Sequence, residues 1–176
     1  MTIGEESKGN EPTNSEKVQK LQAALHAKAK GSPAFRFYAL YDKVYRKDVL
    51  HTAFWQCRRN DGAPGVDEQT FENILDYGVE RWLDELAEEL RMKTYHPQAV
   101  RRVWIPKPDG KQRPLGIPTI KDRVVQTALL LILEPIFEAD LPPEQYAYRA
   151  DHSALDAVQE VSASWTKAIA TWSMRT

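Results

Sequence analysis

The proline-marked segment 101–118 limits what this chain can fold into more than any other part of the sequence. It reads RRVWIPKPDGKQRPLGIP, in which Asp109 and Gly110 stand between short apolar runs at 103–105 and 115–117. Asp-Gly supplies the backbone angles of a two-residue turn, which predicts an antiparallel hairpin with its turn at these residues. Four prolines remove backbone donors from the arms, so neither arm suits the centre of a larger sheet. We therefore expect an edge hairpin that projects outward.

Cations surround the expected turn, namely Lys107, Lys111 and Arg113. A planar guanidinium beside ammonium groups suits the oxygens of a phosphate or a triphosphate. The alternative is an exposed hairpin made soluble by charge, whose lysines block pairing between sheet edges. The segment taken alone leaves both interpretations open.

Charge is distributed unevenly along the chain, although the formal net charge is only -1. Residues 67–90 carry nine acids and one base, whereas residues 91–123 carry nine bases and two acids. Tyr95 and Trp104 stand within the basic block. Cations that neutralise phosphates, interleaved with rings that stack on bases, are typical of a nucleic-acid surface. The alternative is that an acidic helix and a basic hairpin neutralise each other.

Composition excludes several classes of protein. The single cysteine, Cys57, cannot form an internal disulfide and is expected in the core, and the four histidines match no zinc spacing. Residues 1–15 lack the apolar centre of a signal peptide, and no apolar run approaches membrane-spanning length. We expect a cytoplasmic protein with no membrane partner, and 176 residues suffice for one domain with a sizeable core.

Apolar periodicity outside the hairpin predicts a mostly helical region over residues 15–161. Helices are expected at 15–31, 35–45, 48–59, 71–77, 80–92 and 121–138, and after a capping box at Ser153 and Asp156. Residues 1–14 have little to bury and are expected to be disordered. Residues 162–176 lose the pattern and form an off-pattern tail, for which a truncated, frameshifted or split reading frame is the expectation.

Three expectations concern burial. The aromatic residues at 35–45 are expected to fill the core or wrap a neighbour. The apolar residues of 121–138 predict a helix buried on more than one side, which Pro135 kinks or ends, and part of its surface is expected to be exposed in this chain. In the last helix, Leu155, Val158 and Val161 are expected to face inward.

Four sequence blocks occur in a fixed order: DGAPGVD at 61–67, IPKPDGKQRPLGIP at 105–118, KDRVVQ at 121–126 and YAYR at 146–149. This ordered set resembles the N-terminal part of the reverse transcriptases encoded by group II introns, the intron maturase family. Each block alone is a weak signal, but the set is specific. The resemblance covers roughly residues 35–161.

The resemblance implies an α+β fold, the mostly helical fingers subdomain of a right-hand polymerase with a small antiparallel β-hairpin. It implies that the hairpin closes over an incoming deoxynucleoside triphosphate (dNTP), bound by Lys107, Lys111 and Arg113. Positioned cations orient a triphosphate and stabilise the charge that develops on it. The implied partners are intron RNA, an RNA/DNA primer-template and dNTP.

A second group of residues is expected to bind the template or RNA, namely Gly62, Gly65, Arg101, Arg102 and Arg149. Glycines allow the backbone to approach a strand closely. After Arg149 this chain continues with Ala, Asp, His and Ser, where the family usually has Pro, Gly, Arg and Ser. An acid therefore stands where a base would meet nucleic acid, which weakens the case for Arg149.

The resemblance also separates this chain from a complete polymerase. Relatives continue into a palm with a metal-binding aspartate and a Tyr-Ala-Asp-Asp turn, and neither appears here. Polymerisation needs such carboxylates to hold two metal ions, Mg²⁺ in the full-length family. We expect no catalytic residue, no bound metal and no RNA copying by this chain alone, although a palm region or a separate chain is a candidate partner.

Several functions stay open on the sequence. The leading hypothesis is the fingers part of an RNA-directed DNA polymerase whose full-length relatives act in intron splicing and mobility. The alternatives are a non-catalytic module that binds intron RNA and an inert remnant. Without the resemblance, the sequence is also compatible with a plain helical scaffold.

Overall fold

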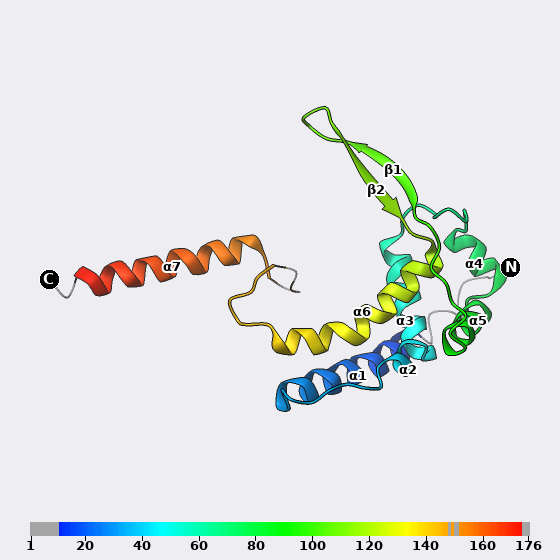
Figure 1. The fold of residues 1–176 in the computed structure, drawn as a ribbon, viewed down its shortest axis with the longest axis horizontal. Coiled ribbons are helices and arrows are strands. Elements are labelled where there is room, and N and C mark those ends of the chain that lie inside the picture. Colours follow the sequence, from blue (N-terminus) through cyan, green and yellow to red (C-terminus); the bar gives the residue numbers. More distant parts are fainter. Residues whose placement is uncertain (1–10, 148, 150–151, 174–176) are drawn as a thin grey trace.

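A computed structural model describes residues 11–147, 149 and 152–173. Its elements are α1 (Glu11–Gly31), α2 (Tyr41–Val44), α3 (Lys47–Asn60), α4 (Phe71–Tyr77), α5 (Val79–Arg91), β1 (Arg101–Pro106), β2 (Gln112–Ile117), α6 (Ile120–Asp140) and α7 (Ala154–Ser173). Figure 1 shows a helical body from which the β1–β2 hairpin and α7 extend separately. Helices with one two-stranded antiparallel sheet confirm the α+β class. No helix in the described ranges is long and apolar enough to cross a membrane.

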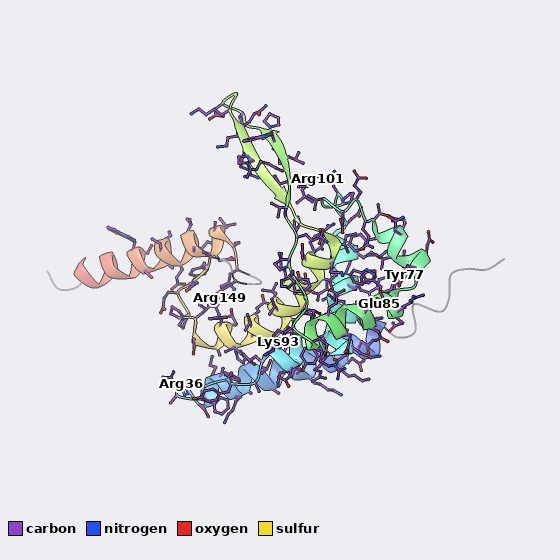
Figure 2. The ribbon with its side chains drawn as sticks, turned by 45° about the vertical axis from the view of Figure 1, so that its right-hand side comes forward. Arg36, Tyr77, Glu85, Lys93, Arg101 and Arg149 are labelled. Carbon is purple, nitrogen blue, oxygen red and sulfur yellow. The ribbon has the colours of Figure 1, made fainter. Side chains whose placement is uncertain are left out.

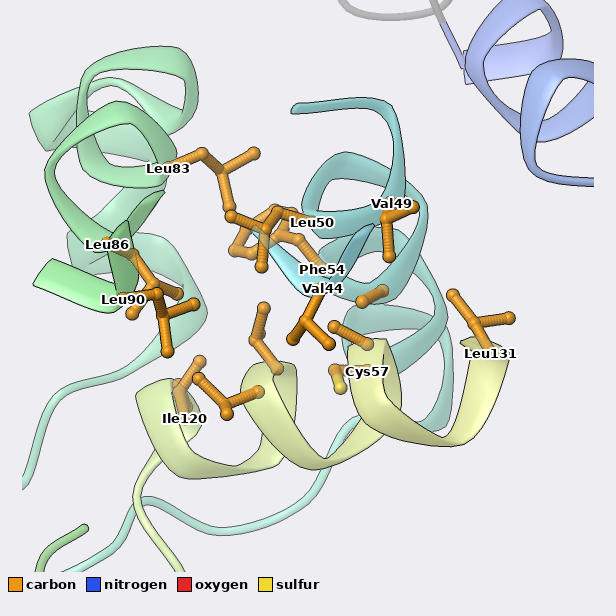
Figure 3. Packing of buried hydrophobic residues seen from close by; sticks show 14 of the residues in the cluster. Val44, Val49, Leu50, Phe54, Cys57, Leu83, Leu86, Leu90, Ile120 and Leu131 are labelled. Atoms are coloured by element: carbon orange, nitrogen blue, oxygen red, sulfur yellow. The ribbon is translucent and has the colours of Figure 1, made fainter. Parts of the chain in front are cut away.

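The core lies where α3 packs against α1, α5 and α6 (Figure 3). Leu50 and Phe54 of α3 are fully buried, and the ring of Phe54 contacts the rings of Phe71 and Trp82. Burying one such side chain stabilises the fold by about 1.5–3 kcal/mol. Cys57 is buried in the same cluster, which confirms its expected place, and burial raises the pKa of its thiol.

The expected apolar helix exists as α6, but only part of its surface is buried. Val124, Ala128 and Ile132 are fully buried, whereas Leu130 and Phe137 are exposed, as expected for part of this surface. The helix continues through Pro135 to Asp140, so Pro135 does not end it. The part of α6 that contains Val124, Ala128 and Ile132 therefore packs in the core.

The prediction of a helix at 35–45 was wrong for most of that segment, although Phe37 and Tyr45 pack against the core as expected. Only Tyr41–Val44 is helical, and Tyr38 is 90% exposed. Phe35 is also exposed, and its ring contacts Phe37 and the ammonium of Lys28 instead of the core. The physical reason is that aromatic residues are weak helix formers and this run follows a break at Gly31 and Pro33.

The last helix has its predicted cap but not its predicted packing. The Ser153 hydroxyl accepts from the backbone N–H of Asp156 at 3.2 Å, and Ser153 donates back to the Asp156 carboxylate. Leu155, Val158 and Val161 are exposed rather than inward-facing, because α7 extends away from the body (Figure 1). The helix also runs past residue 161, through the segment expected to be an off-pattern tail, to Ser173.

At the other end of the chain, α1 begins at Glu11 rather than at the expected Ser15. The expected disorder of residues 1–10 lies outside the described residues and stays a prediction.

The first turn of α6 joins three separate segments through consecutive side chains, which we call the α6 junction: Lys121, Asp122 and Arg123. Lys121 pairs with Glu89 of α5 at 2.9 Å. Arg123 donates to the carbonyl oxygens of Asp61 and Ala63 at 3.1 and 3.0 Å, which holds the glycine-rich loop. The middle residue, Asp122, joins the two ends of the hairpin to the helix.

Asp122 is 3% exposed and accepts several hydrogen bonds. The Thr119 hydroxyl donates to it at 2.8 Å, the backbone N–H of Gln98 donates at 3.2 Å, and the Tyr95 hydroxyl also donates. Burial and this carboxylate raise the pKa of Tyr95, which keeps the phenol protonated as a donor. Gln98 precedes β1 and Thr119 follows β2, so one carboxylate fixes both connections of the hairpin.

We predict that Asp122→Asn lowers the free energy of unfolding by roughly 1.5–3 kcal/mol, because the amide cannot accept from all the donors that now face a carboxylate. Urea denaturation of the full chain measures the loss. Asp140→Asn is the matched control, since Asp140 is exposed on the same helix. Equal stability of the two variants would contradict the role given to Asp122.

Candidate nucleic-acid interface

The hairpin is antiparallel, with Arg101 opposite Ile117 and Pro106 opposite Gln112. Its turn is wider than predicted. The N–H of Gly110 donates to the Lys107 carbonyl at 3.0 Å. Of the residues in the turn, only Gly110 has a positive φ, 78°. The expected two-residue turn at Asp109 and Gly110 was therefore wrong. The reason is Pro108, whose fixed φ suits the second position of a turn that starts at Lys107.

The two faces of the hairpin differ, because alternate residues of a strand point to opposite sides. One face carries Arg101, Val103, Ile105, Arg113 and Leu115, and the other carries Arg102, Trp104, Gln112 and Pro114. The register thus places Arg101 and Arg113 on the same face and Arg102 on the opposite one. The expected RNA contacts at Arg101 and Arg102 do not share one surface.

The hairpin cations are available to a ligand. Lys107, Lys111 and Arg113 are exposed, and within the described ranges none of them forms an ion pair. Arg101 is partly buried at the base of the hairpin (Figure 2), where its Nε atom is buried and has no hydrogen-bond partner. A buried charged donor without an acceptor costs free energy.

The acids of α5 do not neutralise the hairpin. Glu85 pairs with Arg81 of its own helix at 3.2 Å, and Glu88 pairs with Arg91 at 2.8 Å. Asp84 pairs with Lys47 of α3, and Glu89 pairs with Lys121 of the α6 junction. These acids are satisfied within the helical body. The hairpin therefore keeps its positive charge, and of the two interpretations of the charge pattern the structure favours an exposed basic surface.

Gly62 and Gly65 lie against the protein's own residues. A Cβ on Gly65 would lie 2.7 Å from the Cα and N of Thr119, and one on Gly62, where φ is 112°, would lie 3.0 Å from an Arg123 nitrogen. These glycines allow the loop to pack on the start of α6. Their expected contact with a template stays a prediction.

Gly65→Ala should destabilise the chain by roughly 1–3 kcal/mol, because the added methyl meets main-chain atoms that cannot move without displacing the N-cap of α6. Gly31→Ala is the control, since a Cβ there meets nothing within 4 Å. Thermal unfolding of both variants measures the difference. A Gly65 variant as stable as the Gly31 variant would contradict the close approach.

Arg149 lies apart from the hairpin cations. Figure 2 shows it beside the loop that follows α6, whereas Arg101 marks the base of the hairpin. Its side chain is 15% exposed, pairs with Glu138 at 2.5 Å, and donates to the carbonyls of Pro142 and Gln145 at 3.2 Å. The guanidinium thus holds its own loop, and the structure does not bring it together with the other expected site residues.

Sequence reasoning missed the α6 junction. The signal was present, because Thr119 and Asp122 have the spacing of a capping box, in which a hydroxyl and a carboxylate three residues apart bond each other's backbone or side chain. Tyr95 was expected as a stacking ring, but it is half-buried and bound to Asp122. Of the two rings in the basic block, only Trp104 is exposed.

The described side chains do not assemble into a metal site. No group of three or more His, Cys, Asp or Glu residues in the part of the chain that the structure describes lies together as metal ligands do. We assign no step to a metal.

Comparison of the sequence with known proteins identifies relatives of this chain. No protein-family model matches the chain. The chain is 34% identical over 151 residues to Protein YkfC of Escherichia coli (strain K12) and 32% identical over 128 residues to the Group II intron-encoded protein LtrA of Lactococcus lactis subsp. cremoris. The chain is a homologue of the group II intron-encoded proteins. It is also 30% identical over 116 residues to the Putative COX1/OXI3 intron 1 protein of Saccharomyces cerevisiae.

These matches cover most of this chain but less than half of each relative. The three alignments take up 85%, 71% and 65% of the chain, and 39%, 21% and 13% of the respective relatives. The chain thus spans well under half the length of each. The resemblance drawn from the four sequence blocks is confirmed.

Proposed function

We propose that this chain supplies the fingers region of a group II intron-encoded reverse transcriptase and maturase, in which the β1–β2 hairpin contacts intron RNA, the primer-template and dNTP. The carrying observation is an exposed hairpin whose cations form no ion pair within the described ranges, while Asp84, Glu85, Glu88 and Glu89 of α5 are paired within the body. Relatives named for introns support RNA as the partner. The proposed role is binding and positioning, with bond formation left to residues outside this chain.

The turn region suits a triphosphate. Lys107 and Lys111 lie on either side of the turn, joined by a hydrogen bond from the Lys107 N–H to the Lys111 carbonyl at 2.7 Å. Arg113 follows on β2 opposite Ile105. Two flexible ammonium groups and one planar guanidinium provide many donors around a small volume, and the guanidinium alone binds two phosphate oxygens at once.

Arg101 extends this surface toward the body. It shares a face with Arg113, and its buried Nε has no acceptor. The accessible end of its guanidinium, and not the enclosed Nε, would contact a phosphate or a base edge of a bound strand. Arg102, on the other face, is exposed and is assigned to a separate backbone contact.

Changing Lys107, Lys111 and Arg113 together to alanine should weaken binding of group II intron RNA and reduce its salt dependence. For each phosphate that the variant no longer neutralises, the slope of log affinity against log salt falls by about 0.7–0.9. Fluorescence anisotropy of labelled RNA across a salt series measures both quantities.

A triple alanine variant of Lys17, Lys20 and Lys30 is the matched control, because it removes the same charge from exposed positions of α1. The control should keep most of the affinity. Equal losses in the two triple variants would contradict a specific role for the hairpin and leave only general attraction to the net charge.

Binding of RNA alone is the second candidate function, favoured by the arginines on both faces of the hairpin, which spread positive charge over more surface than one triphosphate covers. Arg113→Lys separates the two functions, because it keeps the charge but removes the bidentate fork. We predict that it lowers dNTP affinity roughly tenfold or more and leaves RNA affinity nearly unchanged. Calorimetric titration of dNTP into the complex of chain, RNA template and primer measures this. No dNTP binding by the unmodified chain would favour the RNA-only module.

A further inference from the structure

One face of the hairpin carries Arg102, Trp104, Gln112 and Pro114, and we call it the tryptophan face. None of these residues belongs to the proposed triphosphate site. Trp104 lies opposite Pro114 and is 53% exposed. Nothing in the described ranges stacks on its ring. A large, flat, apolar ring that is exposed to water on a two-stranded hairpin is a surface on which another flat ring can stack.

Neighbouring residues limit the part of the tryptophan face that a ligand can reach. Near the body, Val100 fills the space beside Gly116, where an added Cβ would lie 2.9 Å from a Val100 methyl group. That contact closes the base of the face. The open part is therefore the ring of Trp104 with Pro114 across from it.

Charge around the ring indicates the chemistry of the partner. Arg102 lies two residues from Trp104 on the same face, whereas Lys107 and Lys111 adjoin Pro106 and Gln112 and so continue the face of Arg113. Arg102 is exposed and forms no ion pair within the described part of the chain. A cation beside an exposed indole matches a phosphate beside a flat base, which is the repeating unit of single-stranded nucleic acid.

We infer that Trp104 stacks on a base of single-stranded nucleic acid whose backbone phosphate contacts Arg102. The inference rests on the proposed function and deepens it. Arg113 points to the opposite face of the same ribbon, so the stacked nucleotide is a different one from the nucleotide whose triphosphate Arg113 binds. Stacking needs a free base face, so a base-paired duplex does not use this site.

The test compares Trp104→Ala with Trp165→Ala in the full chain. Trp165 is a matched control because it is 67% exposed but lies on α7. The probes are an oligouridylate of about 12 nucleotides, which matches a single-stranded site, and an abasic oligonucleotide of equal length, which keeps the phosphates and lacks the bases. Anisotropy gives the affinity of each variant for each probe.

Trp104→Ala should weaken binding of oligouridylate by roughly five- to one-hundred-fold, while Trp104→Phe keeps most of the affinity and Trp165→Ala changes it little. The abasic probe should bind all four proteins alike, and the salt slope should not change. Oligodeoxythymidylate should show the same pattern, because stacking does not read the 2′-hydroxyl.

Equal binding of oligouridylate by Trp104→Ala and the unmodified chain, with normal salt dependence, would overturn the stacking site and leave the proposed function intact. A loss of affinity that appears equally with the abasic probe would also overturn it, because the effect would then be on phosphate contacts or on the hairpin itself. No salt-dependent binding of either probe by the unmodified chain would overturn the inference and the proposed function together.

Discussion

A single buried carboxylate determines how the functional part of this molecule is presented. Asp122 is shielded from water, so its charge is tolerated only because hydroxyl and amide donors surround it. Those donors come from the segment before β1 and from the residue after β2. Satisfying one charge thus fixes both connections of the hairpin, and Lys121 and Arg123 beside it join α5 and the glycine-rich loop to the same turn.

The remaining structure consists of a helical body with an apolar core and the charged β1–β2 hairpin that projects from it. Leu50, Phe54 and Ile132 fill the body, and the acids of α5 are paired within it. A hairpin of two strands has no core of its own and depends on its attachment for stability. Attached at the α6 junction, it exposes cations that no acid in the described part of the chain neutralises. This arrangement suits a surface that binds phosphates and at the same time keeps the binding residues in fixed relative positions.

Sequence reasoning succeeded where local chemistry decides and failed where distant neighbours decide. Apolar periodicity predicted α3 and α4 nearly to the residue, and the Asp-Gly pair with its prolines predicted the hairpin. The turn differed because Pro108 also prefers a defined turn position. The stripe at Leu155 identified an apolar helix face, but a pattern does not show whether another element covers it. Likewise, only tertiary structure shows that Gly65 packs on Thr119 and that Arg149 pairs with Glu138.

The central claim is that the hairpin is the surface of this chain that meets RNA. Hydrogen–deuterium exchange of the full chain, with and without group II intron RNA, tests it most directly, because exposed strand amides exchange readily unless a ligand covers them. We expect RNA to slow exchange at 101–117 and to leave α1 and α5 unchanged. Protection of α1 or α5 with an unchanged hairpin would contradict it.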